Sequence, residues 1–366
     1  MRVLMTTDTV GGVWTFTQEL ARGLLERGCA VYLVSLGGAP SDSQKLWPER
    51  LKHEAGACFS YEAWTTPLEW MEENDRAYYL AAGRLIRIAF RWGADLLHSN
   101  QFCFGAVPLS IPKIVTAHSD VLSWAESCRG GVLEESAWLR QYRKLVGDGL
   151  ESADVVSCPT EWMARTVTEY FSVRGELVVI PNGRSVTPPQ GGTRLQAVTA
   201  GRLWDEAKNI GMLGDFRSPL PIFVAGETRH GTAGSTHILP DNMLLGRLSQ
   251  EELLSLFRQS AIYICTSRYE PFGLAPLEAA LCGCAVICND IPSLREVWES
   301  GALYFRDSQS LRNLLCRLSE DGEELVAAQH RSYARARHFS ADTMTERYLR
   351  LYRKVVAGAE RSANVA

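Results

Sequence analysis

Short apolar runs alternate with longer segments of helical periodicity along nearly the whole chain, and this alternation constrains the fold more than any other feature. The runs are rich in Val, Ile and Leu and do not alternate with polar residues, as is typical of parallel strands covered on both faces. Strands separated by helices predict an α/β fold. The predicted strands are Arg2–Thr7, Ala30–Leu36, Asp95–Ser99, Lys113–Ser119, Val155–Thr160, Leu177–Asn182, Gln196–Gly201, Pro221–Gly226, Met243–Gly246, Ala261–Ser267, Cys284–Asp290 and Ala302–Phe305.

A single interruption divides this series of strands. Residues 183–194 are rich in Pro and Gly and show no periodicity, which predicts a linker. The chain has 366 residues, too many for one small domain, and the predicted strands divide about evenly around the linker. We therefore predict two doubly wound, Rossmann-like domains, residues 1-185 and 195-342, that face an interdomain cleft.

Charge and cysteine usage exclude several classes of protein. The 38 Lys and Arg against 42 Asp and Glu give a net charge of −4, without the basic excess of a dedicated nucleic-acid binder. No run of about 18 apolar residues predicts a membrane span, and no signal-peptide pattern is visible, so we expect a cytoplasmic protein. Cys282, Cys284 and Cys288 lie close together, but no His or second Cys pair completes a zinc pattern. We expect reduced thiols in the core.

Ligands of open α/β sheets bind beyond the carboxyl ends of the strands, so the turns after strands are the places to look for chemistry. Gly11 and Gly12 follow the first strand, where paired glycines let backbone N–H groups approach an anion. The alternative is a tight turn that needs Gly. His118 follows another strand and could point into the cleft, although a lone His is more often structural.

Two cations follow the first strand of the second domain. Arg202 and Lys208 could converge on a diphosphate, for which Arg supplies a planar fork of donors and Lys a point charge. The alternative is a pair of surface cations, partly paired with Asp205 and Glu206.

The most informative stretch is 267–283. Glu270 lies in a loop after a strand, and Phe272, Gly273 and Leu274 can present successive backbone N–H groups. Glu278 lies about one turn into the next helix, where its carboxylate can accept hydrogen bonds from two sugar hydroxyls. The alternative for Glu278 is a charge that the helix dipole favours.

At these residues the chain resembles the retaining nucleotide-sugar glycosyltransferases of the GT-B fold, family 4 (glycosyl transferases group 1). Their hallmark is two glutamates separated by seven residues, here Glu270 and Glu278, in the setting Tyr-Glu-Pro-Phe-Gly-Leu. The resemblance covers nearly the whole chain and implies a GT-B hexosyltransferase. It also implies that a C-terminal helix, 343-360, crosses back to complete the first, acceptor-side domain, which leaves the second as the donor side.

The resemblance implies a role for each motif residue. Glu278 would hold the donor ribose, and Glu270 would contact the donor sugar near the reacting carbon. The implied catalytic residues are Glu270, His118, Arg202 and Lys208, with His118 on the transferred sugar and the two cations on the leaving diphosphate. The implied donor-binding residues are Gly11, Gly12, Arg202, Lys208, Arg247, Phe272, Gly273, Leu274 and Glu278.

The same resemblance implies chemistry without a metal or a cofactor, with a nucleoside-diphosphate sugar as co-substrate. Two fixed cations and aimed backbone amides can stabilise the charge of the departing diphosphate. Retention would follow front-face attack, in which the leaving phosphate accepts the proton of the acceptor. The expected partners are the nucleotide-sugar donor and a carbohydrate, lipid-linked or small-molecule acceptor, with no nucleic acid and at most peripheral membrane contact.

Two segments depart from the family pattern. Arg202 and Lys208 are one residue further apart than usual, which a bulged loop would accommodate. Residues 228–240 form a polar stretch where the donor-side domain often has a helix.

Three segments of the first domain bear on the acceptor and on membranes. Cys58–Trp70 and Trp124–Gly131 are interpreted as aromatic-bearing loops, which suit sugar rings but also plain packing. Arg84, Arg87 and Arg91, with apolar neighbours, could touch a membrane surface, although a solvated helix face is the better interpretation.

Two other functions remain open at this stage. A sugar-nucleotide epimerase or a phosphorylase of the same fold would share the donor-side residues. A non-catalytic sugar-nucleotide binding module would be expected to lack Glu270, Arg202 or Lys208, and all three are present.

Overall fold

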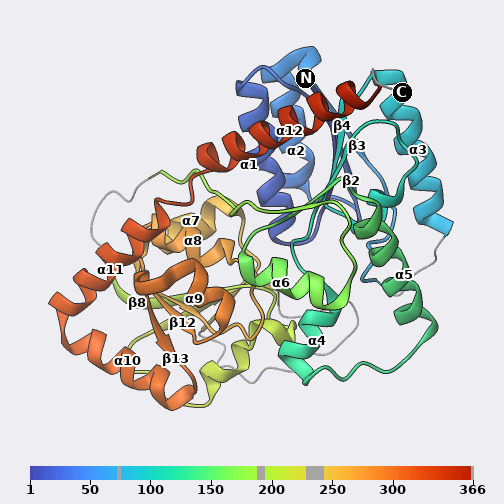
Figure 1. Ribbon diagram of the computed structural model, residues 1–366. Coiled ribbons are helices and arrows are strands. Elements are labelled where there is room, and N and C mark those ends of the chain that lie inside the picture. Colours follow the sequence, from blue (N-terminus) through green and yellow to red (C-terminus); the bar gives the residue numbers. More distant parts are fainter. Residues whose placement is uncertain (72–75, 188–193, 228–242, 364–366) are drawn as a thin grey trace. The chain divides into compact units, whose positions relative to one another are not determined.

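The computed structural model describes residues 1–71, 76–187, 194–227 and 243–363 (Figure 1). The chain forms two compact units. The first comprises Met1–Ser123, Val132–Gly183 and Ala341–Ala366, and the second comprises Trp124–Gly131 and Arg184–Ser340. The predicted polar stretch 228–240 and residues 188–193 of the predicted linker 183–194 lie outside the described residues.

The first unit is built on a seven-stranded parallel sheet with strand order β3-β2-β1-β4-β5-β6-β7. Its order reverses between β1 and β4, so the turns after these strands lie at a switch point, where open sheets bind ligands. The strands are β1 (Arg2–Asp8), β2 (Ala30–Leu36), β3 (Phe59–Ala63), β4 (Leu96–Ser99), β5 (Lys113–Thr116), β6 (Val155–Cys158) and β7 (Glu176–Val179).

Both faces of this sheet are buried, because successive residues of one strand enter different core clusters. Val3 and Met5 of β1 pack in one cluster with residues of α1 (Gly12–Glu26) and α12 (Ala341–Ala363), the first and last helices of the chain. Leu4 packs on the other face of the sheet with residues of α3 (Arg76–Trp92). The other helices are α2 (Asp42–Ala55), η1 (Gly56–Cys58), η2 (Phe102–Ala106), α5 (Ala137–Ser152) and α6 (Glu161–Tyr170). A further helix, α4 (Val121–Arg129), begins in this unit, and its residues from Trp124 onward belong to the second.

The second unit contains a six-stranded parallel sheet with strand order β10-β9-β8-β11-β12-β13. The order reverses between β8 and β11. Its strands are β8 (Arg194–Ala200), β9 (Ile222–Ala225), β10 (Leu244–Gly246), β11 (Ser260–Cys265), β12 (Ala285–Asn289) and β13 (Ala302–Phe305).

This second sheet is also covered on both faces. Ile262 and Ile264 of β11 belong to one core cluster, and Tyr263 and Cys265 belong to the other. The helices are η3 (Glu206–Lys208), η4 (Ile210–Gly214), α7 (Gln250–Gln259), α8 (Leu274–Leu281), α9 (Pro292–Trp298), η6 (Glu299–Gly301), α10 (Ser308–Glu320) and α11 (Gly322–Ala336). The prediction of two parallel-sheet, Rossmann-like domains is therefore confirmed.

The last helix of the chain, α12, belongs to the first unit. It lies beside α1, as the red and blue helices of Figure 1 show. The approach is close, because a Cβ added to Gly23 would lie 2.3 Å from Oγ1 of Thr345. Arg27 of α1 also forms an ion pair with Asp342.

Two segments differ from the sequence prediction. Cys58–Trp70, interpreted as a loop, contains β3 at the edge of the first sheet. An edge strand is covered less than a central one, and the half-buried Phe-Ser-Tyr-Glu-Ala sequence lacks the apolar run used to recognise strands. Trp124–Gly131 is not a loop either, because residues up to Arg129 continue α4.

Candidate functional site

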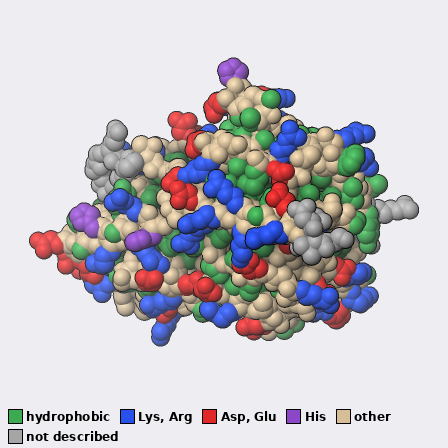
Figure 2. Space-filling model, turned by 45° about the horizontal axis from the view of Figure 1, so that its top comes forward, with side chains coloured by type: hydrophobic (Ala, Val, Ile, Leu, Met, Phe, Trp, Pro, Cys, Tyr) green, Lys and Arg blue, Asp and Glu red, His purple; other side chains and the backbone are tan. Residues whose placement is uncertain are grey.

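Surface charge alone does not mark a site on this protein. Acidic and basic side chains are mixed over the face drawn in Figure 2, as the nearly balanced totals predict. Most of the candidate residues lie instead in the turns that follow strands.

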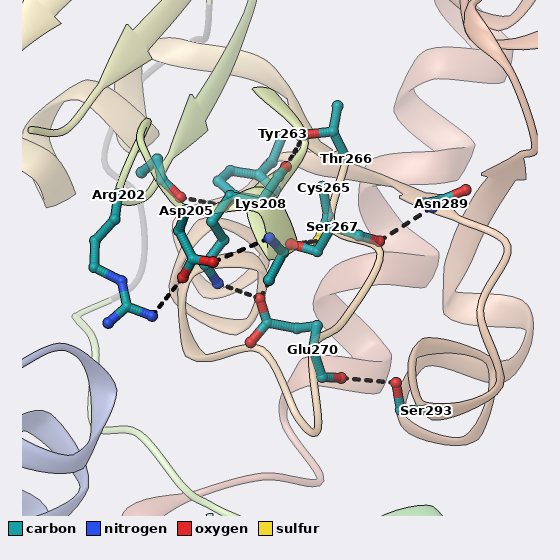
Figure 3. Close-up of polar contacts among 12 residues, drawn as sticks. Arg202, Asp205, Lys208, Tyr263, Cys265, Thr266, Ser267, Glu270, Asn289 and Ser293 are labelled. Carbon is teal, nitrogen blue, oxygen red and sulfur yellow. Dashed lines mark hydrogen bonds and ion pairs between the residues drawn. The ribbon is translucent and has the colours of Figure 1, made fainter. Parts of the chain in front are cut away.

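The predicted cation Lys208 and the predicted carboxylate Glu270 contact each other directly (Figure 3). Nζ of Lys208 donates to Oε2 of Glu270 at 2.5 Å, and the two side chains are 22% and 15% exposed. Burial lowers the pKa of Lys208, but the Glu270 carboxylate outweighs that effect and raises it. Lys208 therefore stays charged, and an ammonium has three N–H donors, so it can hold a second anion.

The loop after β11 fixes the orientation of Glu270. Oγ of Ser267 donates to Oε2 of Glu270 at 3.3 Å, and Oγ of Ser293 donates to the backbone carbonyl of Glu270 at 2.7 Å. Nδ2 of Asn289 holds the carbonyl of Ser267 at 3.1 Å. Strand β12 and helix α9 thus support the loop from its far side.

Arg202 leaves the end of β8 and lies in the same loop as Lys208. Its guanidinium donates to Oδ2 of Asp205 at 2.6 Å and lies 5.2 Å from the centre of the Trp204 ring. The part-exposed side chain keeps further N–H donors available for an anion, since a guanidinium has five. The pairing with Asp205 is the one foreseen in the surface-cation interpretation.

The unusual spacing between Arg202 and Lys208 is accommodated by a single 3-10 turn, η3. Asp205 caps this turn by accepting from the backbone N–H of Ala207 at 3.0 Å, and Asn209 ends it with φ at 48°, in the left-handed region. The turn directs Lys208 back toward Glu270 rather than into solvent.

The helices α1 and α8 have a glycine at the N-cap and no capping side chain, and both lie at predicted ligand sites. Gly11 precedes α1 and Gly273 precedes α8, with φ at 75° and 91°. By contrast, Ser, Thr or Asp side chains cap α5, α6, α7 and α10. First-turn N–H groups without a capping side chain can bind an anion, and Gly12 and Leu274 carry the first such groups of α1 and α8.

Glu278 does not act as an exposed helix-start charge. It is 4% exposed on α8, and its Oε1 lies 2.7 Å from Nε of Arg184. Arg184 lies in the segment that the sequence assigned to a linker, so its side chain had no predicted partner. Arg247, predicted as a donor-binding residue, is exposed just after β10.

His118 of the first unit follows β5, and its imidazole is fixed by a neighbouring strand end. Nδ2 of Asn100 donates to the carbonyl of Thr6 at 2.7 Å, which directs Oδ1 of Asn100 toward Nε2 of His118, 2.7 Å away. Nε2 of His118 must therefore carry the hydrogen. Nδ1 is then the acceptor of the ring, suited to a hydroxyl that donates.

A second histidine, His98, lies on β4 in a fully buried polar network. Its Nδ1 lies 2.5 Å from the hydroxyl of Tyr352, and its Nε2 lies 2.6 Å from Oγ1 of Thr116. Oγ1 of Thr116 lies 2.7 Å from Oγ of Ser157, and that Oγ lies 3.2 Å from the hydroxyl oxygen of Tyr348. The network joins β4, β5 and β6 to α12.

Burial keeps both imidazoles neutral. It lowers the pKa of His98 to about 3, helped by repulsion from His118, and it also lowers the pKa of His118 to about 3. His118 is partly exposed, so the larger effect on stability is expected from His98.

The predicted residues thus fall into two groups. Arg202, Lys208, Glu270, Phe272–Leu274 and Glu278 belong to the second unit, whereas Gly11, Gly12 and His118 belong to the first. Arg184 and Asn100 were not predicted from the sequence. Asn100 directly follows β4, so its place at a strand end could have suggested it. No local signal marks Arg184.

The described part of the chain contains no group of three or more His, Cys, Asp or Glu side chains placed to hold a metal ion. None of its helices combines the length and the apolar character needed to cross a membrane.

Comparison with known proteins places both halves in one family. The model of Glycosyltransferase Family 4 matches residues 10–187, and that of Glycosyl transferases group 1 matches residues 222–337. Alpha-maltose-1-phosphate synthase from Mycobacterium tuberculosis is 27% identical over 98% of this chain and 100% of its own length. Glycogen synthase from the same organism is 25% identical over 93% of this chain and 91% of its own length.

Solved structures show the same fold. Sucrose-phosphate synthase from Thermosynechococcus elongatus superposes with a TM-score of 0.79 at 17% identity, covering 98% of this chain and 100% of that one. Anabaena HepE, solved in complex with UDP and glucose, gives a TM-score of 0.72 at 16% identity. The superposition covers 97% of this chain and 100% of that one. With its two parallel-sheet units and both family models matched, the chain belongs to the family 4 (group 1) glycosyltransferases of the GT-B fold and is a nucleotide-sugar glycosyltransferase.

Proposed function

We propose that this enzyme transfers a hexose from a nucleoside-diphosphate sugar to a hydroxyl of a carbohydrate acceptor, with retention of anomeric configuration and without a metal ion. The observation that carries the proposal is the contact of 2.5 Å between Lys208 and Glu270, with Arg202 in the same loop. A cation and a carboxylate held side by side suit a ligand that has anionic phosphates next to neutral hydroxyls.

The proposed reaction balances without a cofactor. The bond between the anomeric carbon and the oxygen of the distal phosphate breaks, and the acceptor oxygen bonds to that carbon on the same face. The acceptor proton passes to the leaving phosphate oxygen. Arg202 and Lys208 stabilise the charge on the nucleoside diphosphate as it forms, and Glu270 orients the sugar through its hydroxyls rather than by attacking it.

Charge supplied by side chains supports the absence of a metal from this mechanism. Lys208 and Arg202 provide two positive charges, and the first N–H groups of α8 add donors at its glycine start. These groups can do for a diphosphate what a divalent cation does in metal-dependent enzymes.

The proposed acceptor is a sugar or a sugar phosphate. Relatives of similar length are named for making maltose 1-phosphate and glycogen. We retain the prediction of a cytoplasmic enzyme. Peripheral membrane contact also remains a prediction, although Leu80 and Phe90 of α3 are 71% and 87% exposed near Arg84, Arg87 and Arg91.

The experiment is a donor screen followed by product analysis. UDP-, ADP- and GDP-glucose and GDP-mannose are incubated with maltooligosaccharides, glucose 1-phosphate or fructose 6-phosphate, with and without EDTA. Acceptor-dependent release of nucleoside diphosphate that EDTA leaves unchanged is expected. Proton NMR of the new linkage should show the anomeric configuration of the donor.

The other outcomes separate the competing functions. An inverted linkage contradicts retention, and loss of activity in EDTA that added Mg²⁺ or Mn²⁺ restores contradicts metal independence. Epimerised donor without transfer indicates an epimerase, and phosphate-dependent cleavage of the carbohydrate indicates a phosphorylase. Donor binding without any turnover indicates a binding module.

A further inference from the structure

A buried arginine lies opposite the predicted ribose carboxylate. Nε of Arg184 is 2.7 Å from Oε1 of Glu278, and the two side chains are only 8% and 5% exposed. Taking either charge out of water without the other is costly, so each side chain holds its partner in place. This contact has no counterpart in the roles implied by the family resemblance.

The backbone of Arg184 is itself anchored. Arg184 is the first residue of the second unit after Gly183, and its N–H donates to the carbonyl of Phe339 at 3.0 Å. It also forms a parallel bridge with Ser340, the last residue of that unit. The guanidinium therefore projects from a fixed point rather than from a free linker.

The same anchor also touches the donor loop. The ring of Phe339 packs edge-on against Phe272, with centroids 5.3 Å apart and an interplanar angle of 89°. Arg184 and Phe339 thus contact α8 and the loop before it at two points, Glu278 and Phe272. The position of the Glu278 carboxylate depends on this support.

A carboxylate that contacts an arginine can still accept hydrogen bonds from a ligand. It has two oxygens with about four lone-pair positions, and Arg184 faces Oε1. The contact with Arg184 fixes the direction of the carboxylate, and a vicinal diol needs an acceptor held in one orientation.

We propose that Arg184 is a positioning residue that holds the carboxylate of Glu278 oriented toward the two hydroxyls of the donor ribose. The proposal rests on the proposed function and deepens it, because it makes discrimination of the ribose diol depend on a residue that does not touch the donor.

The test compares ribose discrimination among variants. Isothermal titration calorimetry with UDP, ADP and GDP identifies the diphosphate that the wild type binds, and the 2′-deoxy form of that diphosphate is then titrated. The ratio of the two Kd values measures discrimination. We expect a wild-type ratio of about ten or more, since hydrogen bonds to a charged group are strong. Arg184→Gln should bring the ratio close to one.

Two further variants separate positioning from general damage. Arg317→Gln removes another arginine of the second unit that pairs with a glutamate, with Nε 3.0 Å from Oε2 of Glu324, and it should keep the wild-type ratio. Glu278→Gln should lower the ratio as Arg184→Gln does, and combining the two should lower it no further. Circular dichroism shows which variants fold.

The outcomes keep the two proposals apart. If Glu278→Gln abolishes discrimination but Arg184→Gln retains it, the role of Arg184 is wrong and the proposed function stands. If the wild type binds none of the diphosphates, or Glu278→Gln leaves discrimination intact, the donor site itself is wrong. Should Arg184→Gln not fold, Arg184→Lys decides. Lysine is shorter and carries a point charge, so Arg184→Lys should lower the ratio of the two Kd values. A ratio equal to that of the wild type overturns the proposal.

Discussion

The two units hold their buried polar groups in different ways. Beneath the strand ends of the first, His98 is neutral and shares hydrogen bonds with hydroxyl groups. In the second unit, Lys208 contacts Glu270 near the strand ends and Arg184 contacts Glu278 on α8, both as ion pairs. The two units share a parallel-sheet architecture, but the first contains a neutral hydrogen-bond network and the second contains ion pairs.

The difference follows from what each region has to bind or support. A diphosphate brings negative charge, so the region proposed to receive it needs cations that stay charged. The network around His98 joins α12 to the sheet, a task for which neutral groups suffice and avoid the desolvation cost of ions. Variants that exchange or remove these groups test the comparison.

The largest effect is expected at the buried ion pair. Glu278→Leu leaves the charge of Arg184 buried without its carboxylate, which should cost about 3–5 kcal/mol in the free energy of unfolding. Arg184→Met combined with Glu278→Leu should recover most of that loss, because apolar side chains of similar size can replace a buried pair. Urea unfolding measures both. A double variant no more stable than the single one would show that the pair is not the source of the loss.

The next effect concerns catalysis. Lys208→Met should lower kcat about 10²–10³-fold, since it removes a cation proposed to stabilise the leaving diphosphate. Lys354→Met is the matched control. Lys354 also pairs with a glutamate, Glu176, at 2.7 Å, but it is 63% exposed, and its loss should leave kcat unchanged. Equal rates for the two variants would remove Lys208 from the mechanism.

The first unit should lose stability in acid. His98 is neutral when folded, with a pKa of about 3, but it binds a proton in the unfolded chain below about pH 6.5. The unfolded state therefore gains protons as pH falls from 6.5 toward 3, and stability is lost over that window, by about 2 kcal/mol at pH 5. His98→Gln should flatten the dependence of Tm on pH. An unchanged slope would mean that other groups control it.

The smallest effect is expected from a single hydroxyl of the network. Tyr352→Phe leaves Nδ1 of His98 without its partner and should cost about 1–2 kcal/mol in urea unfolding. Tyr79→Phe, on a side chain that is 68% exposed, should change stability by less than about 0.5 kcal/mol. A larger loss in the control would count against the network as the cause.

Much of the fold could be predicted because buried parallel strands have a distinctive sequence. Continuous apolar runs located the other strands, but β3 has the sequence Phe-Ser-Tyr-Glu-Ala and only Phe59 is buried, so no run marks it. The helical periodicity of the C-terminal segment indicated α12. Its attachment to the first unit came from the family resemblance and not from the periodicity.

The candidate site was predictable where a motif carried it. Glu270 and Glu278 have a recognisable spacing, and Lys208 lies in the loop after β8. Arg184 and Asn100 could not be recognised in the same way, because their partners, Glu278 and His118, are distant in sequence or carried by another strand. Such contacts depend on strand order, which apolar runs do not specify.

The docking of α12 has a consequence for how the protein is made. Tyr348 and Tyr352 complete the polar network of the first unit, yet in the chain they follow Arg184–Ser340, which makes up most of the second unit. Most of the second unit is therefore synthesised while the hydroxyl and imidazole groups of the first unit still lack their tyrosine partners. The first unit can reach its native state only after α12 has been made, and a chain that stops before α12 would leave the network of the first unit incomplete.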